Sequence, residues 1–220
     1  MDSPQEVKAH AKAIPVKQVL ILPLLIGGFV VFADYYAVSP KGSMEILTLR
    51  DFVVLPLCAA VPGILIALAY LLFKRTRQTG LKWLFICLVF SVVVVASMRI
   101  GVHIRMNAFA SLAERSAPLI AAIKAYEQKH GQPPASLDVL VPEYLPAIPN
   151  TGMGAYPEYR YMVVADGDQQ DGNPWVIIVH TPTGIIDFDE FFYYPLQNYP
   201  SQRWGGNGVE RVRDWAYMHE

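Results

Sequence analysis

The sequence predicts an α-helical membrane anchor of three transmembrane helices, followed by an α+β domain outside the bilayer. Only 17% of the residues are charged, against about a quarter in an ordinary soluble protein. Almost all long runs without charge lie before residue 105. The second half contains short segments rich in β-branched and aromatic residues, which are typical of strands. We therefore assign residues 1–104 to the anchor and residues 105–220 to the domain.

Three apolar segments are expected to span the membrane, at about 18–38, 52–73 and 82–104. Residues 52–73 contain no charge, and at a rise of about 1.5 Å per residue a helix of this length crosses a hydrocarbon core of about 30 Å. The apolar run of the third segment, 83–98, is shorter, but Lys82 and Arg99 flank it and can extend their side chains to the two interfaces. No acidic residue lies inside the apolar runs of these spans, at 18–33, 52–73 and 83–98, which argues against a proton-coupled transporter.

The first segment has a second interpretation. Basic residues, an apolar stretch and Val31-Phe32-Ala33 also fit a cleavable signal peptide, although Pro23 interrupts the stretch. A prepilin leader cleaved between Gly28 and Phe29 is excluded, because that motif requires Glu at the fifth position after cleavage and the residue there is Ala33.

The orientation is predicted from Lys and Arg beside the helix ends. These residues are concentrated in the N-terminal flank and in the loop before the third helix, as Lys8, Lys12 and Lys17 and as Lys74, Arg75, Arg77 and Lys82. The loop from 34 to 51 is poorer in them. We therefore expect a multi-pass protein of the bacterial inner membrane, with a cytoplasmic N-terminus and a periplasmic C-terminal domain.

The domain is expected to begin with a helix over residues 106–130, whose apolar residues recur every three or four positions. Pro118, with Ser116 as a cap, predicts a break or kink, and Gly131 ends the helix. A capped helical turn at 136–140 follows. Strands are predicted at 159–165, 176–181, 185–194 and 215–218.

Residues 120–126, 130–134 and 136–140 resemble the globular start of type II secretion pseudopilins and related type IV pilin-like domains. Residues 145–149 and 159–161 continue the resemblance, which covers roughly 105–194. It implies a long helix whose second half packs on a small antiparallel sheet. The absence of a processing motif before the third helix, and the two spanning segments that precede it, depart from the family. The resemblance therefore implies a pilin-like domain on a polytopic anchor rather than a filament subunit.

Clustered side-chain oxygens in one predicted hairpin loop are a candidate calcium site, formed by Asp166, Asp168, Asp171 and Asn173. Some pseudopilins hold calcium in their sheet loops, as the resemblance implies. The spacing does not fit the helix-loop-helix calcium motif, however. A solvated loop is the preferred interpretation, and no metal or cofactor is expected to be required.

Asp187, Asp189 and Glu190 could form an acid–base pair for glycan cleavage. Asp187 and Asp189 alternate with Ile186 and Phe188, however, which predicts a strand with one solvated face. No nucleophile elbow, phosphate loop or paired histidine motif occurs, so no catalytic residue is assigned. With a net charge of −1, the chain lacks the overall positive charge that is typical of nucleic-acid-binding proteins, and no nucleic-acid partner is expected.

The segment 188–215 is rich in aromatic residues, with Tyr199, Trp204 and Asn207 as a candidate partner surface. The alternative is a sheet core with a covering loop. We expect a non-enzymatic membrane protein that presents its domain to an envelope protein partner. The alternatives are an envelope glycan-binding or hydrolytic enzyme, and an accessory subunit of a transport or secretion system.

Overall fold

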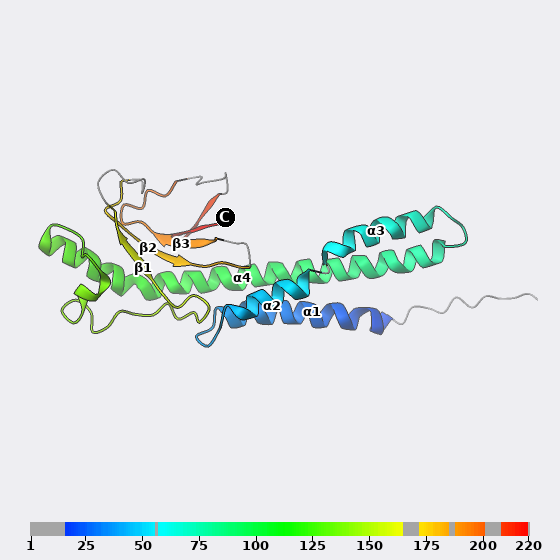
Figure 1. The fold of residues 1–220 in the computed structure, drawn as a ribbon, viewed down its shortest axis with the longest axis horizontal. Helices are drawn as coiled ribbons and strands as arrows, with labels where there is room; N and C mark the ends of the chain where they lie inside the picture. The colour runs from blue at the N-terminus through cyan, green and yellow to red at the C-terminus, as the bar shows by residue number, and fades with distance from the viewer. Residues whose placement is uncertain (1–15, 56, 165–171, 185–187, 201–207, 220) are drawn as a thin grey trace, which may run out of the picture.

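The computed structural model describes residues 16–55, 57–164, 172–184, 188–200 and 208–219. Four α-helices in this part of the chain precede a short 3-10 helix and five strands: α1 Val16–Ala37, α2 Glu45–Val54, α3 Leu57–Leu71, α4 Arg77–His130, η1 Leu137–Leu140, β1 Arg160–Val163, β2 Trp175–His180, β3 Glu190–Tyr193, β4 Val209–Val212 and β5 Trp215–Met218. The sheet lies over the C-terminal half of α4, and α1 to α3 lie along the rest of it (Figure 1). The fold is thus organised around one long helix.

Three helical segments are long and apolar enough to cross a membrane, namely Val19–Ala37, Glu45–Leu71 and Arg77–His130. Many of their large apolar side chains are mostly exposed, including Leu22, Leu25 and Leu65, each more than 60% exposed. Continuous apolar surface of this kind is rare on soluble monomers. The prediction of membrane-spanning helices is confirmed to this extent.

The second segment differs from the single helix predicted at 52–73. It consists of α2, which packs on α1, and α3, which packs on α4 (Figure 1). The sequence has a proline at position 56, between the two helices, and proline has no N–H for a helical hydrogen bond. The polar residues Arg50 and Asp51, expected in a loop, consequently lie in α2.

Small residues bring α3 and α4 into close contact. A Cβ atom on Gly80 would lie 2.7 Å from the Ala67 carbonyl oxygen, and one on Gly63 would lie 3.3 Å from the Cys87 sulfur. Helices in lipid associate through such close backbone approach. The two helices therefore form a tight hairpin.

Of the break or kink predicted at Pro118, the break is wrong, because α4 runs through it from Arg77 to His130. The Ser116 hydroxyl donates to the Ala113 carbonyl oxygen at 2.8 Å instead of capping a new helix. The buried stripe on both sides of the proline, including Leu112 and Ile123, packs against the sheet and offsets the lost hydrogen bond. Gly131 ends the helix in the left-handed conformation, with φ of 72°.

The sheet is antiparallel throughout, in the order β1-β2-β3-β5-β4. The helix-plus-antiparallel-sheet class predicted from the sequence is therefore confirmed. The strands β1, β2 and β5 match their predicted positions. Of the strand predicted at 185–194, the structure has β3 at Glu190–Tyr193, and residues 185–187 lie outside the described part of the chain. Strand β4 was not predicted, because its four residues, Val-Glu-Arg-Val, form too short and too polar a segment.

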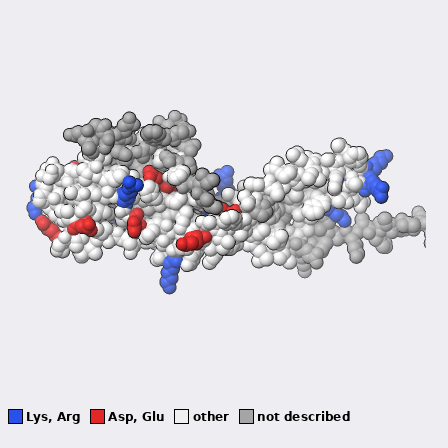
Figure 2. Space-filling view, viewed as in Figure 1, with Lys and Arg blue, Asp and Glu red and all other residues white. Residues whose placement is uncertain are grey.

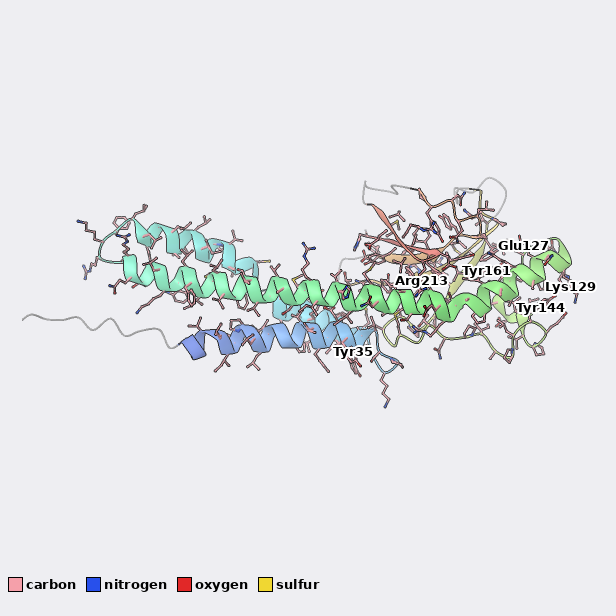
Figure 3. All side chains as sticks on the ribbon, turned by 180° about the vertical axis from the view of Figure 1, so that it is seen from behind. Tyr35, Glu127, Lys129, Tyr144, Tyr161 and Arg213 are labelled. Carbon is pink, nitrogen blue, oxygen red and sulfur yellow. The ribbon has the colours of Figure 1, made fainter. Side chains whose placement is uncertain are left out.

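Both faces of the sheet are buried. The inner face packs on α4 through stacked rings, with the Phe109 ring 4.9 Å from that of Phe191. The indole N–H of Trp175 donates to Glu127, which lies with Lys129 and Tyr144 near the C-terminal end of α4 (Figure 3). The outer face carries a second cluster of Val176, Ile178, Phe192, Tyr194, Ala216 and Met218.

Candidate functional site

Buried charges join the helices to the sheet, and we call this region the junction. Its first centre is Arg50 of α2, which donates to the carboxylate of Asp34 and to the backbone carbonyl of Thr183. The same guanidinium bonds to Asp51 Oδ1 at 2.8 and 3.0 Å. Arginine can serve all three because it has five donors in a planar fork. One side chain thus links α1, α2 and the loop after β2.

Asp34 lies in the last turn of α1 and is 6% exposed, although the sequence placed it outside the apolar run. It faces Gly101 of α4, where any Cβ atom would overlap the Asp34 carboxylate. Glycine is therefore what allows this charged pair to lie between α1 and α4. Burial of two charges is tolerated only when they are well paired, as they are here.

The second centre of the junction is Arg105, which is 7% exposed on α4. It donates to the Thr181 carbonyl oxygen, and its Nη2 lies 3.6 Å from Asp189 Oδ2. Three rings surround its guanidinium, those of Phe109 at 5.2 Å, Tyr217 at 5.4 Å and Tyr156 at 5.8 Å. Such cation–π contacts strengthen when they are desolvated. Arg105 thus anchors the sheet to the helix by both charge and packing.

The predicted exposure of Asp189 is wrong. Asp189 is 3% exposed, whereas its neighbour Phe188 is 70% exposed. The Tyr217 hydroxyl donates to the Asp189 carboxylate, and the Nδ1 of His219 lies 3.4 Å from it. The carboxylate points inward because the helix supplies a buried cation, Arg105, to pair with it.

Backbone hydrogen bonds add a third connection at the junction. The N–H of Gly154 donates to the Ser39 carbonyl oxygen at 2.8 Å, and that of Ala155 donates to Ala37 at 3.1 Å. A Cβ atom on Gly154 would overlap the backbone of Gly42. The α1–α2 loop and the loop before β1 are therefore in direct backbone contact.

A groove of about 600 Å³ opens beside the junction, between Met44 and the start of β1. His180 lies at its edge, with Nδ1 3.3 Å from Glu190 and Nε2 3.3 Å from Arg160 Nη1. This row of polar side chains runs across β1, β2 and β3. Tyr159 also lines the groove, and burial raises the pKa of its hydroxyl to about 12.

Of the predicted partner surface, Trp204 and Asn207 lie outside the described residues. Tyr199 stacks on Tyr194 with ring centres 5.2 Å apart, and its hydroxyl donates to the Asp214 carbonyl oxygen at 2.6 Å. Burial raises the pKa of this hydroxyl above its ordinary value. Tyr199 thus packs its own loop onto the outer face of the sheet.

Of the predicted calcium ligands, Asp166, Asp168 and Asp171 lie outside the described residues. Asn173 is 2% exposed, and its side-chain oxygen accepts from the Leu196 N–H at 3.0 Å. Its amide donates to Asn198 at 2.7 Å. Among the described residues, no group of three or more His, Cys, Asp or Glu side chains could hold a metal ion.

The three candidate catalytic residues do not form one group among the described residues. Asp187 lies outside the described residues, Asp189 belongs to the junction, and Glu190 is half-buried beside His180. Sequence reasoning missed Asp34, Arg50 and Arg105 as members of one site. The sequence does contain one indication that Arg105 is buried. It lies four residues before Phe109, which places it on the apolar face of the helix.

No protein-family model, curated protein or solved structure matches the chain. The function is therefore inferred from the geometry of the junction and of the residues around it.

Proposed function

We propose that this protein is a non-enzymatic, multi-pass protein of the bacterial inner membrane, which presents a pilin-like domain in the periplasm for protein–protein interaction. The observation that carries the proposal is the junction. Three separate connections, through Arg50, Arg105 and the backbone at Ala155, attach the sheet to the apolar helices. A domain attached in this way is held at a set orientation to the bilayer.

The position of the charges supports the proposed orientation. Lys74 and Arg75 lie in the loop between α3 and α4, and Arg77 is the first residue of α4. This loop lies at the opposite end of the molecule from the sheet (Figures 1 and 2). By the positive-inside rule this loop is cytoplasmic, and the sheet is then periplasmic. Tyr35, 62% exposed on α1, lies near the end of the helix closest to the sheet, where an aromatic belt is expected (Figure 3).

The junction also favours a non-enzymatic role over glycan hydrolysis. A general acid or base must reach a proton on the substrate. Asp189 is 3% exposed and already accepts a hydrogen bond from Tyr217. Its charge serves to hold Arg105, which supports a structural assignment for this carboxylate.

The membrane orientation is tested with reporter fusions to the full chain. A reporter active only in the periplasm should be active after His219 and silent after Arg77. The reverse pattern would disprove the proposed orientation.

The interaction role is tested by photo-crosslinking in intact membranes. A crosslinking amino acid at Val163, which is 46% exposed on the outer strand β1, should capture a defined envelope protein. The same group at Leu65, 62% exposed on α3, should not capture it. Loss of capture in an Arg105→Met variant that is still inserted would tie the contact to the orientation of the domain. Equal capture from both positions, or hydrolysis of envelope glycans by the purified chain, would overturn the proposal.

A further inference from the structure

Three exposed cations lie where α3 turns into α4, namely Lys74 and Arg75 in the turn and Arg77 as the first residue of α4, and we call them the basic tip. None of the three forms an ion pair with a described residue. The sequence has no Asp or Glu between Asp51 and Glu114, so no acidic side chain of this long stretch compensates the charge. The basic tip therefore carries a net positive charge, which attracts anions from outside the chain.

The backbone of the basic tip is held by its own hydrogen bonds. The Thr76 hydroxyl donates to the Tyr70 carbonyl oxygen at 2.9 Å, and the Thr76 N–H donates to Phe73 at 3.1 Å. The Gly80 N–H donates to Thr76 at 2.9 Å, and the contact between Gly80 and Ala67 closes the hairpin. The three cations thus extend from an ordered turn, which lowers the entropy cost of binding a ligand.

Exposed apolar side chains lie directly beside these cations. Leu72 is 81% exposed, Phe73 is 65% exposed and Trp83 is 55% exposed. Figure 2 shows Lys and Arg gathered at this end of the molecule, next to a surface with few charged residues. A ligand that covers both features needs an anionic group and an apolar chain in the same molecule.

We propose that the basic tip binds the phosphates of anionic phospholipid headgroups, with the acyl chains against the neighbouring apolar residues. This inference rests on the proposed membrane location of α3 and α4. Guanidinium groups match phosphate oxygens with two parallel hydrogen bonds, which suits Arg75 and Arg77. Each cation near an anionic membrane surface strengthens association by about fivefold, so the three together contribute about a hundredfold.

The test uses the purified full chain in a neutral detergent, titrated with phosphatidylglycerol or with phosphatidylcholine. Bound lipids are counted by native mass spectrometry. The wild-type chain should retain phosphatidylglycerol at least about tenfold more strongly than phosphatidylcholine. The triple variant Lys74→Gln, Arg75→Gln, Arg77→Gln should lose this preference.

A matched control removes three exposed cations elsewhere, as Lys41→Gln, Lys124→Gln and Arg160→Gln. It changes the net charge equally and should keep the preference. An Arg75→Lys, Arg77→Lys variant should retain most of the binding, which separates loss of charge from misfolding. The inference is overturned if the triple variant keeps the preference or if the control loses it equally. Saturation of the site by soluble glycerol phosphate would also overturn it, because the ligand would then be free phosphate.

Alkaline extraction of membranes separates this inference from the proposed function. If the wild-type chain is released into the soluble fraction, the membrane location itself is wrong. If the wild-type and triple-variant chains both stay in the membrane and bind the two lipids equally, only the headgroup site is wrong.

Discussion

Arg105 of α4 and Asp189, the residue before β3, form a buried ion pair in which Nη2 lies 3.6 Å from Oδ2. The two side chains are 9% and 4% exposed, so water contributes little to their solvation. The pair connects the helix that enters the apolar region to the central strands of the sheet. Its loss should therefore affect the whole domain.

Replacing Arg105 with Met should lower the stability of the protein by about 3–5 kcal/mol, because it removes the buried guanidinium that pairs with the Asp189 carboxylate. For a chain of this size the midpoint of thermal unfolding should fall by on the order of 10 °C. The measurement is thermal unfolding of the full chain in detergent. Arg99→Met, at an exposed position on the same helix, is the matched control and should have little effect. Adding Asp189→Leu to Arg105→Met should restore much of the loss, and no recovery would contradict the assigned pairing.

The contact between Gly101 and Asp34 makes a second prediction. Gly101→Ala should destabilise the protein by about 1–3 kcal/mol, because its methyl group would overlap the Asp34 carboxylate. Gly28→Ala on α1 is the control, since a Cβ atom there has no neighbour within 4 Å. The higher helix propensity of alanine should leave this control unchanged or slightly more stable. Equal unfolding midpoints for the two variants would rule out the close approach of α1 and α4.

Two nearby tyrosines should respond oppositely to loss of their hydroxyls at neutral pH. The Tyr159 hydroxyl is buried and has no partner among the described residues, whereas the Tyr161 hydroxyl donates to the Pro134 carbonyl oxygen at 2.9 Å. Tyr159→Phe should therefore be neutral or stabilising, by up to about 1–3 kcal/mol, and Tyr161→Phe should cost about 1 kcal/mol. Chemical unfolding of both variants measures the difference. A loss of stability in Tyr159→Phe would indicate a hydrogen-bond partner for that hydroxyl.

Tyr159 also predicts a loss of stability at alkaline pH. Burial raises the pKa of its hydroxyl from about 10 to about 12. Between these values the unfolded chain releases the proton and the folded chain keeps it, so stability falls as pH rises, by at most about 1.4 kcal/mol per unit from this group. Below pH 10 the group contributes no slope. Unfolding measured from pH 9 to 12 should show a shallower decline in Tyr159→Phe than in the wild type, and parallel curves would refute the assignment.

Removal of calcium should leave the thermal midpoint unchanged. The buried side chain of Asn173 bonds to Leu196 and Asn198, so Asn173→Ala should cost about 1–3 kcal/mol in millimolar calcium and in chelator alike. Asp168→Ala is the comparison and should have little effect in either condition. A midpoint that rises with calcium, and no longer does so in Asp168→Ala, would establish a metal site in this loop instead.

Sequence pattern was sufficient where the structure depends on local periodicity. The apolar stripe from Phe109 to Ile123 predicted the helix that packs on the sheet, and β-branched and aromatic residues predicted β2 to within one residue of its observed bounds. Of the break or kink predicted at Pro118, the break does not occur, because the local cost of proline is smaller than the packing gain of a helix held by a sheet. A rule based on local sequence does not include the packing energy of a contact that forms only in the folded chain.

The junction was not predictable for a related reason. The pairing of Asp34 with Arg50, and of Arg105 with Asp189, joins residues that periodicity treats independently. The alternation around Asp189 correctly indicates two opposite faces but does not tell which face is buried. The buried cation Arg105 on α4 determines which face is buried, and the sequence of the strand region does not reveal this cation.

The continuity of α4 has a mechanical consequence. Its 54 residues give a length of about 81 Å, whereas a bilayer core is about 30 Å thick. A membrane helix adjusts to a thinner or thicker bilayer by tilting. With the span proposed above, a change of about 10° in tilt would move the far end of an arm of about 40 Å sideways by about 7 Å. With that span, the helix would act as a lever that converts a change in bilayer thickness into displacement of the sheet.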